Sequence, residues 1–230
     1  MKVVLKKIGW VFFSGFLYAG PPMMTDDPFA PDVGQFEINF ASEVENSDDL
    51  TVVAPIVDIN YGIFPNTQLT IETAYASSDN KYKSDGLEVA IKYNFYRSDT
   101  LNIALYPKYL FYPISTPFNE GESYELQIPI SLKLSDNVEW VTSFSYLYPQ
   151  KEEKHYEVGT YLAYENNNHT YYLETYLEEN PTDNNLATFF NVGYFYQYKE
   201  NLGFMASIGA EMVASKQEAD VGYLGLQVVF

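Results

Sequence analysis

The sequence contains no cysteine, which excludes disulfide bonds, thiol catalysis and thiolate metal sites. Among its 230 residues there is one arginine, Arg97, and there are two histidines, His155 and His169. After the first 19 residues, no apolar run approaches the roughly 18 residues that a membrane-spanning helix needs. The side-chain chemistry that remains is mainly that of carboxylates, lysines and phenolic rings.

The charge and aromatic content narrow the class of protein further. The 31 acidic residues against 13 basic ones give a formal net charge of −18, which argues against nucleic acid as a partner because phosphates are bound by basic side chains. The 22 tyrosines and 16 phenylalanines are a heavy aromatic load. Such rings form the interfacial belts of membrane barrels.

The first 19 residues are predicted to be a cleavable signal peptide. Lys2, Lys6 and Lys7 precede the apolar run 8–19, and we expect cleavage after Ala19. A membrane anchor is disfavoured, because about twelve residues reach only about 18 Å as a helix. Removing this segment takes away three basic residues and no acid, so the net charge of the mature chain is −21.

The rest of the chain alternates apolar and polar residues in segments of about ten to thirteen, separated by turn residues. This period of two predicts strands with two different faces, each long enough to cross a bilayer when tilted. We therefore predict an all-β fold, a transmembrane antiparallel up-and-down β-barrel over 35–230; a soluble sandwich is the alternative. The twelve expected strands are Gln35–Val44, Thr51–Ile63, Thr67–Ala76, Gly86–Tyr96, Leu101–Tyr112, Ser123–Leu134, Asn137–Tyr148, His155–Glu165, His169–Glu178, Asn185–Tyr198, Leu202–Val213 and Asp220–Phe230.

Connections between these strands are alternately short and longer, as in outer-membrane barrels. An even number of strands places both termini on the periplasmic side. The last strand ends in a carboxy-terminal aromatic residue, Phe230, and resembles the closing strand of Gram-negative outer-membrane barrels. That resemblance implies that Phe230 is an insertion signal and that the partners include barrel-insertion machinery, outer-membrane lipid and lipopolysaccharide.

A short block precedes the first expected strand. Thr25-Asp26-Asp27-Pro28, followed by Gly34-Gln35 and an early Glu37, resembles the start of a family of outer-membrane transporters named for the MetA pathway of phenol degradation. The resemblance implies a barrel that moves small, often aromatic or hydrophobic, compounds. From the residues themselves, we expect 20–34 to be a periplasmic N-terminal arm that caps the first strand. The alternative is an arm inside the lumen, with Asp26 and Asp27 meeting a lumenal lysine or a cation.

Alternate residues along a strand face opposite sides of the sheet, and we use this parity to assign each residue to the lipid or to the lumen. The residues assigned to the lumen are mainly acidic. Walls of one charge sign concentrate ions of the other, so eleven acids against three bases predict a mild cation preference. The absence of an arginine ladder argues against a porin for acidic sugars. The inward acids are Glu37, Glu43, Asp58, Glu72, Glu88, Glu125, Glu139, Glu157, Glu174, Glu178 and Glu211; the bases are Lys92, Lys108 and Lys133; the rings are Tyr106, Tyr112, Tyr161, Tyr172, Tyr176, Phe189, Phe195 and Tyr223.

The function expected from these observations is passive passage of small solutes through an outer-membrane channel, with no cofactor and no metal. A plugged barrel with a structural or surface-interaction role is the alternative. A barrel lipid hydrolase is less favoured, because such an enzyme needs a hydroxyl nucleophile beside an oriented base. No serine lies two residues from His155, and His169 lies beside a short turn.

Overall fold

The computed structural model describes residues 22–47, 50–78, 81–111, 122–149, 154–179, 186–213 and 216–230. The predicted signal peptide and Tyr112 lie outside these residues. The described part of the chain contains no helix that is long and apolar enough to cross a membrane.

All twelve predicted strands are present. The largest differences are at β4 and β12, which begin five and four residues earlier than expected, so the two hairpins extend further toward their loops. The strands are β1 (Phe36–Asn46), β2 (Leu50–Phe64), β3 (Thr67–Ser78), β4 (Lys81–Arg97), β5 (Leu101–Phe111), β6 (Ser123–Lys133), β7 (Val138–Pro149), β8 (His155–Asn166), β9 (His169–Glu179), β10 (Leu186–Lys199), β11 (Leu202–Val213) and β12 (Lys216–Val229).

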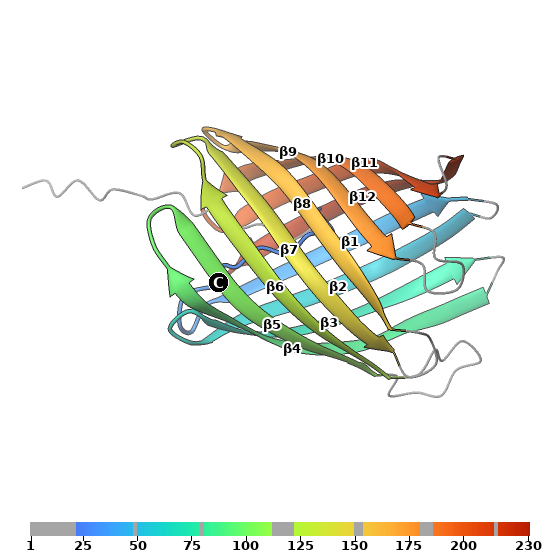
Figure 1. Ribbon diagram of the computed structural model, residues 1–230, viewed down its shortest axis with the longest axis horizontal. Coiled ribbons are helices and arrows are strands. Elements are labelled where there is room, and N and C mark those ends of the chain that lie inside the picture. Colours follow the sequence, from blue (N-terminus) through green and yellow to red (C-terminus); the bar gives the residue numbers. More distant parts are fainter. Residues whose placement is uncertain are drawn as a thin grey trace, which may run out of the picture.

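The strands form one closed antiparallel barrel in which each strand pairs with its neighbours in sequence and β1 pairs with β12 (Figure 1). At the closure, the backbone N–H of Phe36 donates to Phe230 at 3.1 Å, and the N–H of Phe230 donates to Phe36 at 2.8 Å. Closure pairs the two edges that hydrocarbon could not satisfy with hydrogen bonds. The predicted fold class is therefore confirmed.

The two ends of the barrel differ. Short turns join β2–β3, β4–β5, β6–β7, β8–β9 and β10–β11 at the end where the C-terminus lies, which we call the turn end (Figure 1). Asn66 and Asn167 have φ of 59° and 56°, a conformation that asparagine tolerates in tight turns. The other strand ends meet at the opposite end, the loop end, where the connections are not all longer: two residues separate β3 from β4 and β11 from β12, whereas eleven separate β5 from β6.

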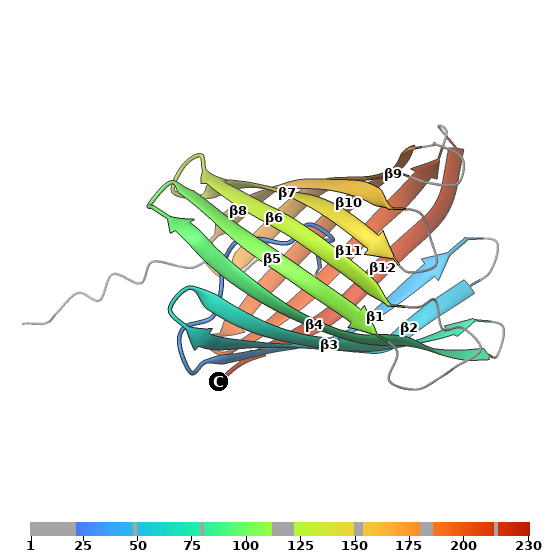
Figure 2. The same ribbon diagram turned by 60° about the horizontal axis from the view of Figure 1, so that its bottom comes forward.

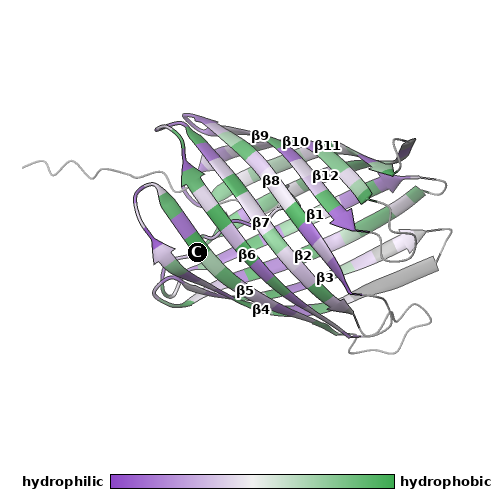
Figure 3. Ribbon diagram, viewed as in Figure 1, coloured by the Kyte–Doolittle hydropathy of each residue, from purple (hydrophilic) through white to green (hydrophobic). Residues whose placement is uncertain are grey.

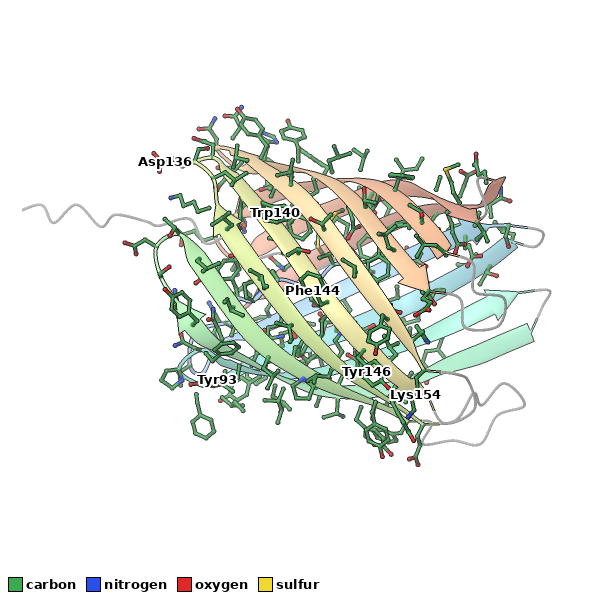
Figure 4. The ribbon with its side chains drawn as sticks, viewed as in Figure 1. Tyr93, Asp136, Trp140, Phe144, Tyr146 and Lys154 are labelled. Carbon is green, nitrogen blue, oxygen red and sulfur yellow. The ribbon has the colours of Figure 1, made fainter. Side chains whose placement is uncertain are left out.

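The outer wall of the barrel is apolar. Hydropathy alternates along each strand (Figure 3), and Trp140 and Phe144 lie on the outer face of β7 (Figure 4). Large apolar side chains exposed all around a barrel are the pattern of a lipid-facing surface, not of a soluble sandwich. Apart from rings, this exposed set includes Ile71, Ile91, Leu126, Ile128, Leu162, Leu173, Val192, Ile208 and Leu224.

Exposed rings gather near the two ends of the strands. At the turn end the ring of Phe36 stacks on Tyr61 with centroids 4.3 Å apart, and at the loop end Tyr109 stacks on Tyr124 at 4.8 Å. Tyr93, labelled in Figure 4, and Phe95 belong to the first group and are about half exposed. Aromatic girdles of this kind mark the two interfaces of a membrane barrel.

Candidate functional site

The N-terminal arm comprises residues 22–34. Its part up to Pro31 lies in the interior of the barrel, whereas Asp32, Val33 and Gly34 are exposed (Figure 2). Thr25, Asp27 and Pro28 are almost fully buried, and Met23 packs in an apolar cluster with rings from β8, β9, β10 and β12. This placement agrees with the alternative of an arm inside the lumen and not with the expected periplasmic arm that caps the first strand. The physical reason is that the wall offers this segment both apolar contacts and charged partners.

Glu174 in the middle of β9 holds the start of the arm. Its carboxylate is completely buried and accepts hydrogen bonds from the backbone N–H of Thr25 at 2.7 Å and of Met24 at 3.2 Å. Asn191 on β10 donates both to Glu174 at 3.0 Å and to the carbonyl oxygen of Pro22 at 3.0 Å. Backbone donors inside the lumen are thereby satisfied by wall side chains, as buried polar groups require.

The two aspartates of the arm meet the two lumenal lysines. Asp26 Oδ2 lies 2.9 Å from Lys108 Nζ, and Asp26 Oδ1 lies 3.9 Å from Lys92 Nζ. Asp27 Oδ1 lies 3.8 Å from Lys92 Nζ. Lys108 also lies 3.5 Å from Glu125 on the neighbouring strand β6. The predicted alternative, in which these carboxylates meet a lumenal lysine, describes the observed geometry.

The two aspartates respond differently to this environment. Burial alone would raise the pKa of Asp26, but the charges of Lys108 and Lys92 outweigh burial and hold that pKa below its usual range. Burial raises the pKa of Asp27 well above its usual range, and Lys92 offsets only part of this effect. The arm therefore carries one firmly ionised carboxylate and one that takes up a proton readily.

Inward-facing glycines make room for the arm. A Cβ on Gly193 of β10 would lie 2.1 Å from Cε of Met23, and a Cβ on Gly159 of β8 would lie 2.1 Å from Oγ1 of Thr25. These contacts are far below van der Waals separation, so a larger residue at either position requires the arm to shift. The wall and the arm are thus complementary in shape as well as in charge.

The wall strands β1 to β5, which carry the two lysines that pair with the arm, also present a polar surface to the lumen. Asp58 accepts hydrogen bonds from Asn39 at 3.0 Å and from Asn60 at 2.8 Å. The ring of Tyr106 lies between the two lysines, with Lys92 Nζ 4.7 Å and Lys108 Nζ 4.8 Å from its centroid. These cation–π contacts and hydrogen bonds fix the lumenal groups in place.

A cavity of about 490 Å³ remains in the lumen beside the arm. Its lining contains two bases, Lys92 and Lys108, and rings that include Tyr106, Tyr176, Phe189 and Tyr223. Ten acids also line it, so acidic side chains far outnumber basic ones in the lining. These acids are Asp26, Asp27, Glu37, Glu43, Glu45, Asp58, Glu72, Glu88, Glu178 and Glu211.

The remaining expected site residues lie in several places. Tyr161 and Tyr172 are buried and pack edge to face, with ring centroids 5.7 Å apart, in the cluster that receives Met23. Glu157 accepts a hydrogen bond from the hydroxyl of Tyr176. Lys133 differs from its expected lumenal position: it lies exposed at the turn-end rim and pairs with Asp136 at 3.3 Å, because its strand ends there.

The two histidines and the arginine have other environments. His169 lies at the turn end, where its Nδ1 is 2.7 Å from the hydroxyl of Tyr194, and His155 lies between Glu157 and Glu178 at the loop end. These particular contacts do not have the hydroxyl–imidazole–carboxylate order of a serine hydrolase. Arg97 is exposed and donates to the Asn66 side chain at 3.1 Å, away from the lumen.

Sequence reasoning did not identify the groups that seat the arm. Glu174 was expected in the lumen, but its role as acceptor for the arm backbone was not, and neither was the contribution of Asn191. The signal in the sequence is the pair of glycines at inward-facing positions, Gly159 and Gly193. An empty lumen would leave room for larger side chains there, so glycine at these positions indicates that a segment packs against the wall.

Comparisons with known proteins agree on the fold. No protein-family model matches the sequence, and no curated protein matches it. Among solved structures, an outer membrane channel from Pseudomonas putida F1 is similar with a TM-score of 0.69 and 13% identity, over 89% of this chain and 98% of that one. The KdgM porin is similar with a TM-score of 0.63 and 15% identity, over 84% of this chain and 99% of that one.

The CymD monoaromatic hydrocarbon channel is similar with a TM-score of 0.56 and 8% identity, over 87% of this chain and 89% of that one. At these identities the similarity establishes the fold. The chain is a closed antiparallel β-barrel of the kind found in outer-membrane channels.

Proposed function

We propose that this protein is a channel of the bacterial outer membrane that passes small solutes by passive diffusion. The observation that carries the proposal is the closed twelve-stranded barrel with a lipid-type outer wall and a polar, charged interior that still contains a cavity of about 490 Å³. A barrel that served only as a scaffold would have no need of an unfilled polar lumen. The similar solved structures, which are channels and porins, support the same reading.

The arm is the constriction of this channel. It is held by side chains of the wall rather than by strand pairing, through Glu174, Asn191, Lys92 and Lys108. Contacts of this type are individually worth a few kcal/mol at most, so removal of one contact should shift the balance between a docked and a released arm. A permanently plugged barrel is the second candidate, and the burial of Thr25 and Asp27 is the observation that favours it.

The lining indicates the class of solute. Ten acids against two bases in a narrow lumen attract cations and oppose anions, and the tyrosines offer hydroxyl groups and ring faces. We therefore expect small cationic or neutral solutes, with phenolic compounds among the neutral ones. The resemblance of the Thr25-Asp26-Asp27-Pro28 block to the MetA-pathway transporters points toward the same aromatic compounds.

Planar-bilayer recordings and liposome swelling test the function. Steady ohmic steps with cation-selective reversal potentials support passage, and swelling with phenolic compounds and amino acids but not with acidic sugars supports the solute class. The double variant Glu72→Gln/Glu88→Gln should lower the cation preference, because both side chains line the cavity. Glu200→Gln, in an exposed turn, is the matched control.

Two results would contradict the proposal. Silence of the wild-type protein would be the first, and conductance in a variant without residues 20–31 would then favour a barrel that is permanently plugged by its arm. Recovery of the mature protein in the soluble fraction instead of the outer-membrane fraction would remove the membrane location itself.

A further inference from the structure

A second group of titratable side chains lies on the lumenal wall at the loop end. His155 and Glu157 are two residues apart on β8 and so face the same side of the sheet. Glu157 is directly opposite Glu178 in the pairing of β8 with β9. The backbone register alone therefore brings one imidazole and two carboxylates together.

The distances within this group suit a metal ion. His155 Nε2 lies 3.5 Å from Glu157 Oε1 and 3.7 Å from Glu178 Oε1, and one ligand atom from each residue falls within 4.8 Å of the others. A tetrahedral Zn²⁺ with bonds of about 2.0–2.2 Å holds neighbouring ligand atoms roughly 3.3–3.6 Å apart. The two separations from His155 are already close to this range, and the two carboxylates lie within 4.8 Å of each other.

The electrostatics of the group favour a cation as well. Two carboxylates directly opposite each other on paired strands repel, so the pairing of Glu157 with Glu178 is unfavourable unless positive charge lies between them, which either a protonated His155 or a bound metal ion supplies. The adjacent Lys154 does not supply that charge, since its Nζ lies 4.2 Å from the ring centroid of Tyr148 (Lys154 is labelled in Figure 4).

The surroundings provide orientation and access. The hydroxyl of Tyr176 donates to Glu157, and a hydrogen bond of this kind commonly orients a metal-binding carboxylate. The side chains of His155 and Glu157 are 7% and 12% exposed, whereas that of Glu178 is 44% exposed. Two ligands are thus fixed in the wall, and the third leaves a side open for entry and for a water ligand.

We propose that His155, Glu157 and Glu178 form a binding site for a divalent transition-metal ion, represented by Zn²⁺, near the loop end of the lumen. One imidazole with two carboxylates is a donor set for first-row transition metals, whereas a site built of oxygen ligands alone suits Mg²⁺ or Ca²⁺. The site is separate from the contacts that hold the arm, and it does not depend on solute passage.

Calorimetric titration of the detergent-solubilised mature protein with ZnCl₂ tests this site. We expect one ion per chain. His155→Ala should abolish binding, and Glu157→Gln and Glu178→Gln should each weaken it about tenfold or more. Tyr176→Phe should weaken it less, since it removes an orienting partner. His169→Ala is the matched control and should bind as the wild type does.

The visible absorption spectrum of bound Co²⁺ distinguishes a defined site from unspecific binding to scattered acidic groups. Co²⁺ in a tetrahedral site with a histidine ligand absorbs strongly in the visible region, whereas Co²⁺ bound by exposed carboxylates and water absorbs weakly. The proposal is overturned if the wild type takes up no Zn²⁺ saturably, or if uptake and the Co²⁺ spectrum persist unchanged in His155→Ala. Heat-dependent mobility of the barrel in detergent gels shows that each variant is folded.

Discussion

The carboxylate of Glu174 accepts a hydrogen bond of 2.7 Å from the backbone N–H of Thr25, a residue 149 positions earlier in the chain. The bond joins the middle of strand β9 to the N-terminal arm inside the lumen. Because Glu174 is completely buried and binds a second arm N–H, that of Met24, it is the main polar anchor of the arm. Arm position, and with it the width of the lumen, should therefore respond to this one side chain.

Replacing Glu174 with alanine should release the arm. The change leaves the N–H groups of Thr25 and Met24 without their acceptor, which costs about 1–3 kcal/mol in the docked state. That loss corresponds to a roughly 5- to 150-fold smaller docked-to-undocked ratio. Single-channel recordings should show a higher open probability. Glu139→Ala, at a buried wall position on β7, is the control, and equal recordings from both variants would contradict this role.

The barrel was predictable from sequence because lipid and lumen impose opposite demands on neighbouring residues of every strand. Alternation in β6, from Tyr124 to Lys133, encodes this directly, and all twelve strands follow it. The arm was not predictable in the same way. Its residues have no periodicity, and its position depends on contacts such as Asp26 with Lys108, between residues 82 positions apart.

Sequence parity also has a limit at the ends of strands. Lys133 has the inward parity of β6 but is the last residue of that strand, so its side chain reaches the turn and pairs with Asp136. Lumenal positions near the middle of strands, such as Glu174 and Lys92, are buried as expected. Parity therefore predicts which face a residue takes, and only the three-dimensional register shows its depth along the barrel.

The ion pair of Asp26 with Lys108 should be energetically coupled. The two charged groups are 2.9 Å apart, and their side chains are 24% and 14% exposed, so water screens them only in part. A double-mutant cycle with Asp26→Asn and Lys108→Met should give a coupling of about 0.5–3 kcal/mol in arm docking. Protease protection of the arm measures docking in each variant. If the changes in docking free energy of the two single variants add up to that of the double variant, the two charges are not coupled.

Shape complementarity between Gly193 and Met23 predicts a suppressor. Gly193→Ala adds a Cβ that would lie 2.1 Å from Cε of Met23, so the arm must shift and conductance should rise. Met23→Ala removes the clashing atoms, so the double variant should return toward wild-type conductance. Gly222→Ala, where the new Cβ has open space, is the control. If the double variant conducts like Gly193→Ala alone, the effect of that substitution does not arise from its clash with Met23.

Docking of the arm should strengthen as the pH falls through the raised pKa of Asp27 toward about 4. Burial raises the pKa of Asp27 well above its usual range in the docked arm, whereas the released arm exposes this carboxyl, whose pKa returns to about 3.9. The docked state therefore binds the proton more tightly, and lowering the pH through the raised pKa favours docking. Asp26 acts in the opposite sense: its lowered pKa stabilises docking above about pH 3.9, and this contribution is lost only in stronger acid.

Open probability in single-channel recordings should thus decrease as the pH is lowered through this window. Asp27→Asn should give low, nearly pH-independent opening, while Asp26→Asn should keep the pH response. If Asp27→Asn titrates as the wild type does, other lumenal carboxylates govern the response.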